Sequence, residues 1–317
     1  MTTVTPSLDD IEARLATLRA TLMSFIGSDR IKGLLSLGPS ISVLGIIYFL
    51  PILALFILSF GTESSFTGFE FTLEHYGDIF PLDPLLSFNF ADLLYLGLLA
   101  KSLKVSLYVT IVSLVLSYPI TYYIGNRVQE AYRLPLMMLI MVPFWTSYLV
   151  RTYSWIPILS ENGLINGLLT TIGLQPLQLL YTPLATNIGL VYLHLPFMIL
   201  PLYASMAGLD AAHIEAAQDL GATRLRVFRE IVLPLTMPGA AAGVIFVFIK
   251  STAAYVVPTL LGGPNGILYM NVVVSQFRQT YNWNFGAALS FILLAIVLAI
   301  LYAAQKMGAS LGSAQMR

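Results

Sequence analysis

Six long apolar segments constrain the fold of this chain more than any other feature of its sequence. Their lengths lie near the ~20 residues that an α-helix needs to cross the hydrocarbon core of a bilayer. The composition agrees, because 57% of the 317 residues are hydrophobic and only 10% are charged, against about 25% charged residues in soluble domains. Backbone polar groups inside a bilayer must pair within the protein, which favours helices. We therefore predict an all-α, polytopic membrane protein with six transmembrane helices, at residues 41–60, 102–124, 135–150, 184–206, 237–257 and 285–304.

Prolines interrupt several of these segments. A proline removes one backbone hydrogen bond and its ring crowds the preceding turn, so sharp bends in helices are commonly found at proline. We expect a kink at Pro51 in the first segment, and breaks near Pro196 and Pro201 in the fourth.

The apolar segments also divide the chain into three regions. Residues 1–40 form an N-terminal segment in which Ile11, Leu15, Leu18 and Leu22 recur at helical spacing. They predict an amphipathic helix over 7–25 that lies on the membrane surface or on a partner. This segment lacks a basic stretch followed by an apolar core, so we do not expect a cleavable signal peptide. Residues 41–304 form the membrane domain and residues 305–317 a short tail.

Several function classes are disfavoured by composition. The chain has no Cys, which excludes disulfides and thiolate metal sites, and its three His are far apart in the sequence. A formal net charge of zero suggests no nucleic-acid partner. No phosphate-binding loop of the GxxxxGK[ST] type is present, so we expect no nucleotide or other cofactor on this chain. A membrane enzyme would need clustered catalytic groups, and a stand-alone secondary transporter or channel usually shows acids or inverted repeats within its spans. Neither is evident.

The basic residues predict the orientation of the chain. Cytoplasmic loops are enriched in Lys and Arg. With six spans and a cytoplasmic N-terminus, most of the Lys and Arg lie inside, and both termini are cytoplasmic in an inner membrane. The inside set is Arg14, Arg19, Arg30, Lys32, Arg127, Arg133, Arg224, Arg226, Arg229, Lys306 and Arg317, and the outside set is Lys101, Lys104, Arg151 and Arg278.

A polar loop at residues 209–235 separates the fourth and fifth segments. Asp210 can cap a helix over 211–220 by accepting a hydrogen bond from the first turn. Gly221 stands where a left-handed residue would end that helix, and Thr223 can cap a second helix over 224–231. Pro234 and Pro238 then mark the return into an apolar segment. The loop is predicted to be a compact helix–turn–helix on the cytoplasmic side.

The spacing in this loop also resembles a family signature. Glu215-Ala216-Ala217, three residues, Gly221, nine residues, Ile231, one residue and Leu233-Pro234 is similar to the EAA loop in the membrane subunits of binding-protein-dependent ABC importers. The alternative is an ordinary amphipathic interfacial helix, which would not require the full spacing. The resemblance implies that the loop docks in a groove of a cytoplasmic ATPase. The implied coupling residues are Asp210, Glu215, Ala216, Ala217, Gly221, Ile231, Leu233 and Pro234.

The likeness extends beyond the loop, from about residue 71 to residue 304. The stretches FTLEHY (71–76), PFWTSYLVRTYSW (143–155), LVYLHLPFMILPLY (190–203) and LLGGP (260–264) resemble the spermidine/putrescine-type branch of importer permeases. This resemblance implies a six-helix type I importer fold and a non-catalytic permease subunit. It also implies a second homologous permease, two ATPase subunits that bind ATP and Mg, and an extracytoplasmic substrate-binding protein.

One departure from the branch concerns the substrate. An acid often precedes the LLGGP stretch in the fifth span of this branch, and here Lys250 stands nearby instead. A polyamine substrate is implied by the resemblance, but a lysine on its route would repel it. An opine, an amino-acid derivative or a small carboxylate is the alternative.

Aromatic and basic groups supply the candidates for the substrate pathway, because aromatic faces attract ligand cations. Three alternatives stay open: the aromatics could form an interfacial belt, His194 could be a buried and hydrogen-bonded histidine, and Lys250 could pair with a backbone carbonyl or with an acid of a partner permease. The candidates are Trp145, Tyr153, Trp155, His194, Lys250 and Tyr255.

Overall fold

The computed structural model describes residues 29–62, 70–80 and 94–315, and the predicted helix over 7–25 lies outside them. The chain divides into two parts at Leu58, each described separately below. The described portion of the first part is one helix, α2 (Asp29–Leu58), and its apolar stretch Leu37–Leu58 contains most of the first predicted span. α2 continues through Pro51, and the kink predicted there stays a prediction.

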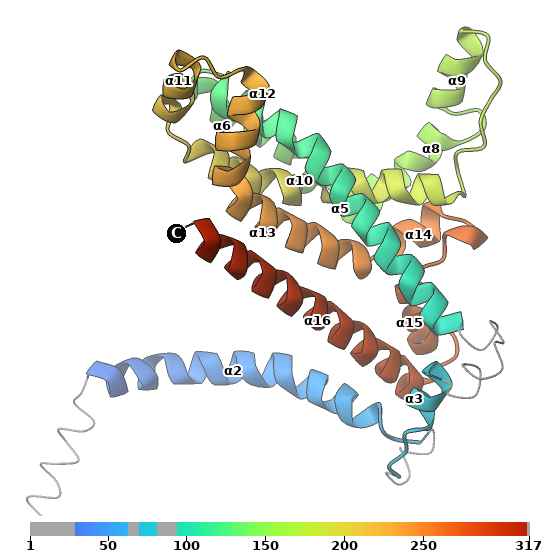
Figure 1. Ribbon diagram of the computed structural model, residues 1–317. Coiled ribbons are helices and arrows are strands. Elements are labelled where there is room, and N and C mark those ends of the chain that lie inside the picture. Colours follow the sequence, from blue (N-terminus) through green and yellow to red (C-terminus); the bar gives the residue numbers. More distant parts are fainter. Residues whose placement is uncertain (1–28, 63–69, 81–93, 316–317) are drawn as a thin grey trace, which may run out of the picture. The chain divides into compact units, whose positions relative to one another are not determined.

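The second part begins at Ser59 and is helical (Figure 1). Within its described residues the only β pairing is an isolated bridge between Gly61 and Phe71. Its elements are α3 (Glu74–Ile79), α5 (Leu94–Asn126), α6 (Glu130–Met141), η2 (Val142–Trp145), α7 (Tyr148–Tyr153), α8 (Trp155–Leu159), α9 (Leu164–Thr171), α10 (Pro183–Ala207), α11 (Ala211–Asp219), α12 (Arg224–Val227), η3 (Phe228–Val232), α13 (Leu233–Thr252), α14 (Val256–Leu261), η4 (Pro264–Gly266), α15 (Tyr269–Arg278) and α16 (Trp283–Gln315).

Five helices in the described residues are long and apolar enough to cross a membrane, or six if one bent pair counts as a single span. The predicted all-α polytopic fold is therefore confirmed. The bent pair joins Glu130–Trp145 to Tyr148–Thr171 at 93°. The helix predicted over 135–150 is thus interrupted near its end, where Thr146 is extended and its Oγ1 donates to the carbonyl of Pro143 at 2.7 Å.

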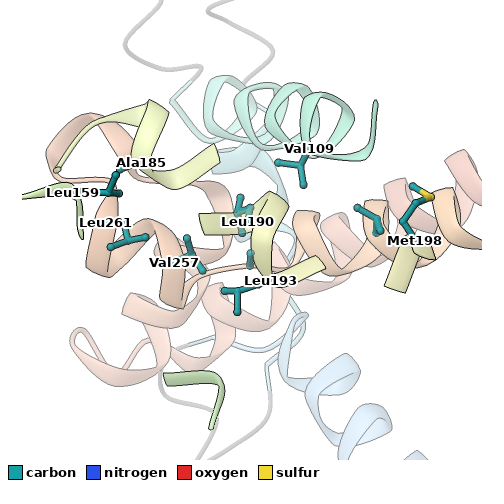
Figure 2. Packing of buried hydrophobic residues seen from close by; sticks show 10 residues of the cluster. Val109, Leu159, Ala185, Leu190, Leu193, Met198, Val257 and Leu261 are labelled. Atoms are coloured by element: carbon teal, nitrogen blue, oxygen red, sulfur yellow. The ribbon is translucent and has the colours of Figure 1, made fainter. Parts of the chain in front are cut away.

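The helices α5, α10 and α13 pack against one another and form the centre of the second part. Small residues allow the close approach of α10 and α13. A Cβ on Gly239 would collide with the backbone carbonyl of Pro201 and with Ser205, and one on Gly243 would lie 3.2 Å from the Met198 backbone. Figure 2 shows the apolar cluster at this centre, formed by residues such as Val109, Leu190, Leu193, Met198, Val257 and Leu261.

The fourth span is continuous, which corrects the breaks predicted near Pro196 and Pro201. α10 passes through both prolines as one helix. A proline removes only one ladder hydrogen bond, and a helix packed on both sides within a membrane protein tolerates that loss. The packing of α5 and α13 against α10 supplies such support.

The fifth span differs from its prediction at both ends. The helices predicted over 224–231 and 237–257 are wrong as separate elements, because α12, η3 and α13 form one continuous helix, Arg224–Thr252. Its η3 portion is a π-helical turn, in which the Leu233 N–H donates to the Phe228 carbonyl. This wider turn comes just before Pro234 and leaves space for the proline ring, so the helix continues through Pro234. The helix then ends at Thr252, and α14 begins after a short irregular stretch.

Candidate functional site

The loop after α10 folds by local capping, as its sequence predicts. Asp210 caps α11, and its Oδ1 accepts a hydrogen bond from the Ala212 N–H at 2.9 Å. Thr223 caps α12, and its Oγ1 accepts from the Arg226 N–H at 3.4 Å. Both caps satisfy backbone donors that a helix start leaves without partners.

Gly221 ends α11 in the left-handed conformation, with φ of 85°. The Gly221 N–H donates to the Gln218 carbonyl at 2.8 Å, and the Ala222 N–H donates to the Ala217 carbonyl at 3.0 Å. These two bonds form a Schellman motif, which satisfies the last carbonyls of the helix and fixes the direction of the chain that follows. The predicted left-handed turn is therefore confirmed.

The loop has one anchored face and one open face. Ile214, Ala217, Ala222 and Ile231 pack on a buried cluster at the ends of α5, α10 and α13. This cluster contains Tyr118, Leu202, Met206, Val227, Val232 and Ala240.

The open face carries the signature residues Glu215 and Ala216, both exposed. Leu220 is 89% exposed, although it is a large apolar residue. Leu233 is exposed and Pro234 is half-buried, both in the first turn of α13. Figure 1 shows α11 beside α12, which continues through η3 into α13. The second half of the polar loop is therefore continuous with the fifth span.

A second group of candidates lies around the end of α13. The Ser251 Oγ and the His194 Nδ1 are 2.9 Å apart, within hydrogen-bond distance. Further along the two helices, Gly243 packs against Met198, and Gly189 packs against Val257 and Leu261. These contacts show that α13 and α14 run antiparallel to α10. Lys250 is in the last turn of α13, not in the interior of a longer helix as predicted, yet it stands opposite the middle of α10. The helix of the fifth span therefore ends beside the middle of α10, which forms the fourth span.

The break in the third span lies beside this interruption. α7 follows that break directly and packs against both α10 and α14. It carries Arg151, whose Cζ lies 4.3 Å from the ring centroid of Phe144. The Lys250 Nζ lies 4.2 Å from the ring centroid of Phe197. The two rings contact each other edge to face, with centroids 5.5 Å apart.

Neither Lys250 nor Arg151 has an acidic partner in the part of the chain that the structure describes. The ion pair found there joins Arg226 to Glu230 in the polar loop. The Arg151 Nε and Nη1 are enclosed there without a hydrogen-bond acceptor. Sequence reasoning missed Arg151, Phe144 and Phe197 as site residues. The run PFWTSYLVRTYSW contains two of them, but nothing in it indicates contact with α10.

The remaining pathway candidates are less closely grouped. Trp155 packs edge to face on Tyr192 with centroids 5.4 Å apart, whereas Trp145 is 87% exposed. Tyr153 and Tyr255 are also exposed, and the carbonyl of Tyr255 accepts a hydrogen bond from Asn271. His194 is 3% exposed and bonded to Ser251, which fits the alternative of a buried, satisfied histidine. Among the described residues no group of His, Asp or Glu could hold a metal ion.

The fold and the anchored polar loop together define a multi-pass permease of the importer class. Residues 117–306 match the family described as "Binding-protein-dependent transport system inner membrane component". The chain belongs to this family. It is therefore a non-catalytic membrane subunit of the inner membrane.

Similar proteins agree with this assignment. The chain is 40% identical over 257 residues to "Spermidine/putrescine transport system permease protein PotB" of Escherichia coli (strain K12), covering 80% of this chain and 89% of PotB. It is 33% identical over 287 residues to "Inner membrane ABC transporter permease protein YdcU" of the same organism, covering 86% of this chain and 87% of YdcU. A crystal structure of a bacterial ABC transporter for alginate contains a chain with the same fold, at a TM-score of 0.69 and 18% identity, covering 92% of this chain and 99% of that one.

Proposed function

We propose that this chain forms half of the membrane pathway of an ATP-driven importer for a small organic solute. One observation carries the coupling part of the proposal. The polar loop is anchored on one face by Ile214, Ala217 and Ile231 and leaves Glu215, Ala216 and Leu220 open on the other. A face that stays exposed while the opposite face is anchored is available to a docking partner.

The partners of the proposed importer follow from the family. They are two ATPase subunits that bind ATP and Mg, a second homologous permease and an extracytoplasmic binding protein. Because this chain has no phosphate-binding loop, energy from ATP reaches it mechanically through the polar loop. Binding and hydrolysis of ATP on the partners shift the population between inward-open and outward-open states. The polar loop and both termini then lie on the cytoplasmic side, in agreement with the distribution of Lys and Arg.

Two substrate classes are supported by different observations. A polyamine is supported by the likeness to PotB, a spermidine/putrescine permease subunit that is 40% identical to this chain over 257 residues. A zwitterionic or acidic solute, such as an opine or another amino-acid derivative, is supported by Lys250 and Arg151 beside the break in the fifth span.

Reconstitution of the complete importer in proteoliposomes tests the proposed class. We expect uptake of a labelled solute only with ATP on the side of the ATPase subunits and binding protein on the other. The purified chain alone should give no uptake. Uptake by the chain alone, without ATP, would instead identify a stand-alone transporter or channel.

A further inference from the structure

Two positive charges at the depth of the α10 midpoint have no negative partner among the residues that the structure describes. Lys250 and Arg151 sit on the rings of Phe197 and Phe144, and these rings contact each other. No Asp or Glu is found on η2, α7, α10, α13 or α14, the elements that surround the two cations. A charge inside a membrane is costly unless it faces a partner or water.

Local contacts hold the cations in place but leave their charge uncompensated. The quadrupole of each ring attracts the cation above it. Lys250 also lies in the last turn of α13, where the free carbonyls favour a positive charge. Both effects stabilise a cation, and neither supplies a counter-charge. The enclosed Nε and Nη1 of Arg151 still have hydrogen-bond capacity for an acceptor that the described part of the chain does not provide.

The backbone around the cations points to a cavity. The third span breaks between Trp145 and Tyr148, and the fifth between Thr252 and Val256. Irregular backbone at membrane depth is tolerated where it is buried in protein or lines a water-filled cavity. The Lys250 side chain is exposed in this subunit, and a water-filled pathway is a surrounding at this depth that tolerates its charge.

We propose that Arg151 and Lys250, seated on the Phe144–Phe197 ring pair, bind the carboxylate of the transported solute. The guanidinium of Arg151 supplies charge and hydrogen-bond donors to a carboxylate, and Lys250 adds a second charge. The solute class is then an amino acid derivative or another carboxylate-bearing amine. A plain polyamine would meet two like charges and no acid on η2, α7, α10, α13 or α14. This inference rests on the proposed function, because it needs the site to lie on the path.

The absence of Cys from the chain allows a direct test of charge preference at the site. Lys250→Cys is placed in the complete importer and treated, during ATP turnover, with an anionic sulfonatoethyl and a cationic trimethylammonioethyl methanethiosulfonate. To correct for the different reactivities of the two reagents, each rate of cysteine modification is divided by the rate at which the same reagent modifies a small thiol in solution. We expect the anionic reagent to be favoured about tenfold by the remaining charge of Arg151. Adding Arg151→Met should bring the ratio close to one.

Uptake of a matched pair of solutes provides the second arm. Ornithine and putrescine differ by one carboxylate, and both are offered to the wild-type importer and to Lys250→Met. We expect ornithine uptake to exceed putrescine uptake and to fall at least tenfold in Lys250→Met, with assembly of the variant importer checked by co-purification of its subunits. The thiol reaction needs no transported solute, so it decides the charge preference by itself if neither solute is accepted.

Three results would overturn the proposal. Faster reaction with the cationic reagent, or no reaction with either, would show that the site is not an anion site open to water. Putrescine uptake that is unchanged by Lys250→Met would show that the lysine does not select the solute. Failure of Lys250→Met to assemble with the second permease would assign the lysine to an acid of that partner. None of these results affects ATP-dependent uptake by the wild-type importer, so the proposed function would survive each of them.

Discussion

At the scale of single residues, Gly221 sets the geometry of the polar loop. Its φ of 85° is a conformation that costs other L-residues roughly 1–2 kcal/mol. A Cβ at this position would meet no atom within 4 Å, so the cost of a substitution is conformational and not steric. The glycine is therefore needed for its backbone freedom. The effect of a substitution should depend on how readily the new residue adopts a positive φ.

We expect Gly221→Val to reduce substrate-stimulated ATP hydrolysis of the complete importer several-fold, because a β-branched residue resists the left-handed conformation and would misplace α12. Gly221→Asn is the matched control, since asparagine visits this conformation more readily and should retain most of the activity. Membrane insertion of both variants is checked by their yield after purification. Equal activity of the valine and wild-type proteins would contradict the role assigned to the turn.

At the scale of elements, the contact between α10 and α13 determines where the sites lie. The close approach at Gly239 leaves no space for a side chain next to Pro201 and Ser205. It sets the register that places Ser251 at His194 and Lys250 at Phe197. A change in this contact should therefore affect stability and the site together.

We expect Gly239→Ala to destabilise the protein by about 1–3 kcal/mol, because an added methyl group must push two packed helices apart. Gly167→Ala on α9 is the control, since a Cβ there meets nothing within 4 Å. It should be neutral or slightly stabilising, as alanine is a better helix former than glycine. Thermal unfolding in detergent measures both. A Gly239→Ala protein as stable as the control would mean that α10 and α13 are not in the contact described.

Features set by neighbouring residues could be predicted from the sequence, and features set by packing could not. The caps at Asp210 and Thr223 and the turn at Gly221 depend on side chains within a few positions, and the structure has them as predicted. The continuity of α12 with α13 depends on a π-helical turn that no composition rule indicates. The Phe144–Phe197 contact joins two different spans, so it becomes visible only when the helices are packed.

At the scale of the whole molecule, the polar loop can reach a cytoplasmic ATPase only in one orientation of the chain in the membrane. Thr223 lies in the polar loop beside several arginines, and Glu161 lies in the segment between α8 and α9. The distribution of basic residues predicts that the first is cytoplasmic and the second is extracytoplasmic.

We expect a single cysteine introduced as Glu161→Cys to react with an impermeant maleimide added to intact cells. Thr223→Cys should react only after the membrane is opened. Both positions are exposed in the subunit, so a difference in labelling reports the side of the membrane. Labelling in the opposite order would reverse the topology and remove the polar loop from the side where ATP is hydrolysed.

Cross-linking of the polar loop to the ATPase subunit tests whether α11 docks on that subunit. Ala216→Cys lies on the open face and Ala217→Cys on the anchored face, so adjacent positions serve as probe and control. In the complete importer with cysteines introduced along the ATPase groove, a short bifunctional maleimide should join Ala216→Cys to the ATPase and leave Ala217→Cys largely unlinked. The yield at Ala216→Cys should change with nucleotide, because the loop moves with the ATPase. No cross-link at either position, in an importer that still transports, would contradict the proposal that α11 couples ATP hydrolysis to this permease.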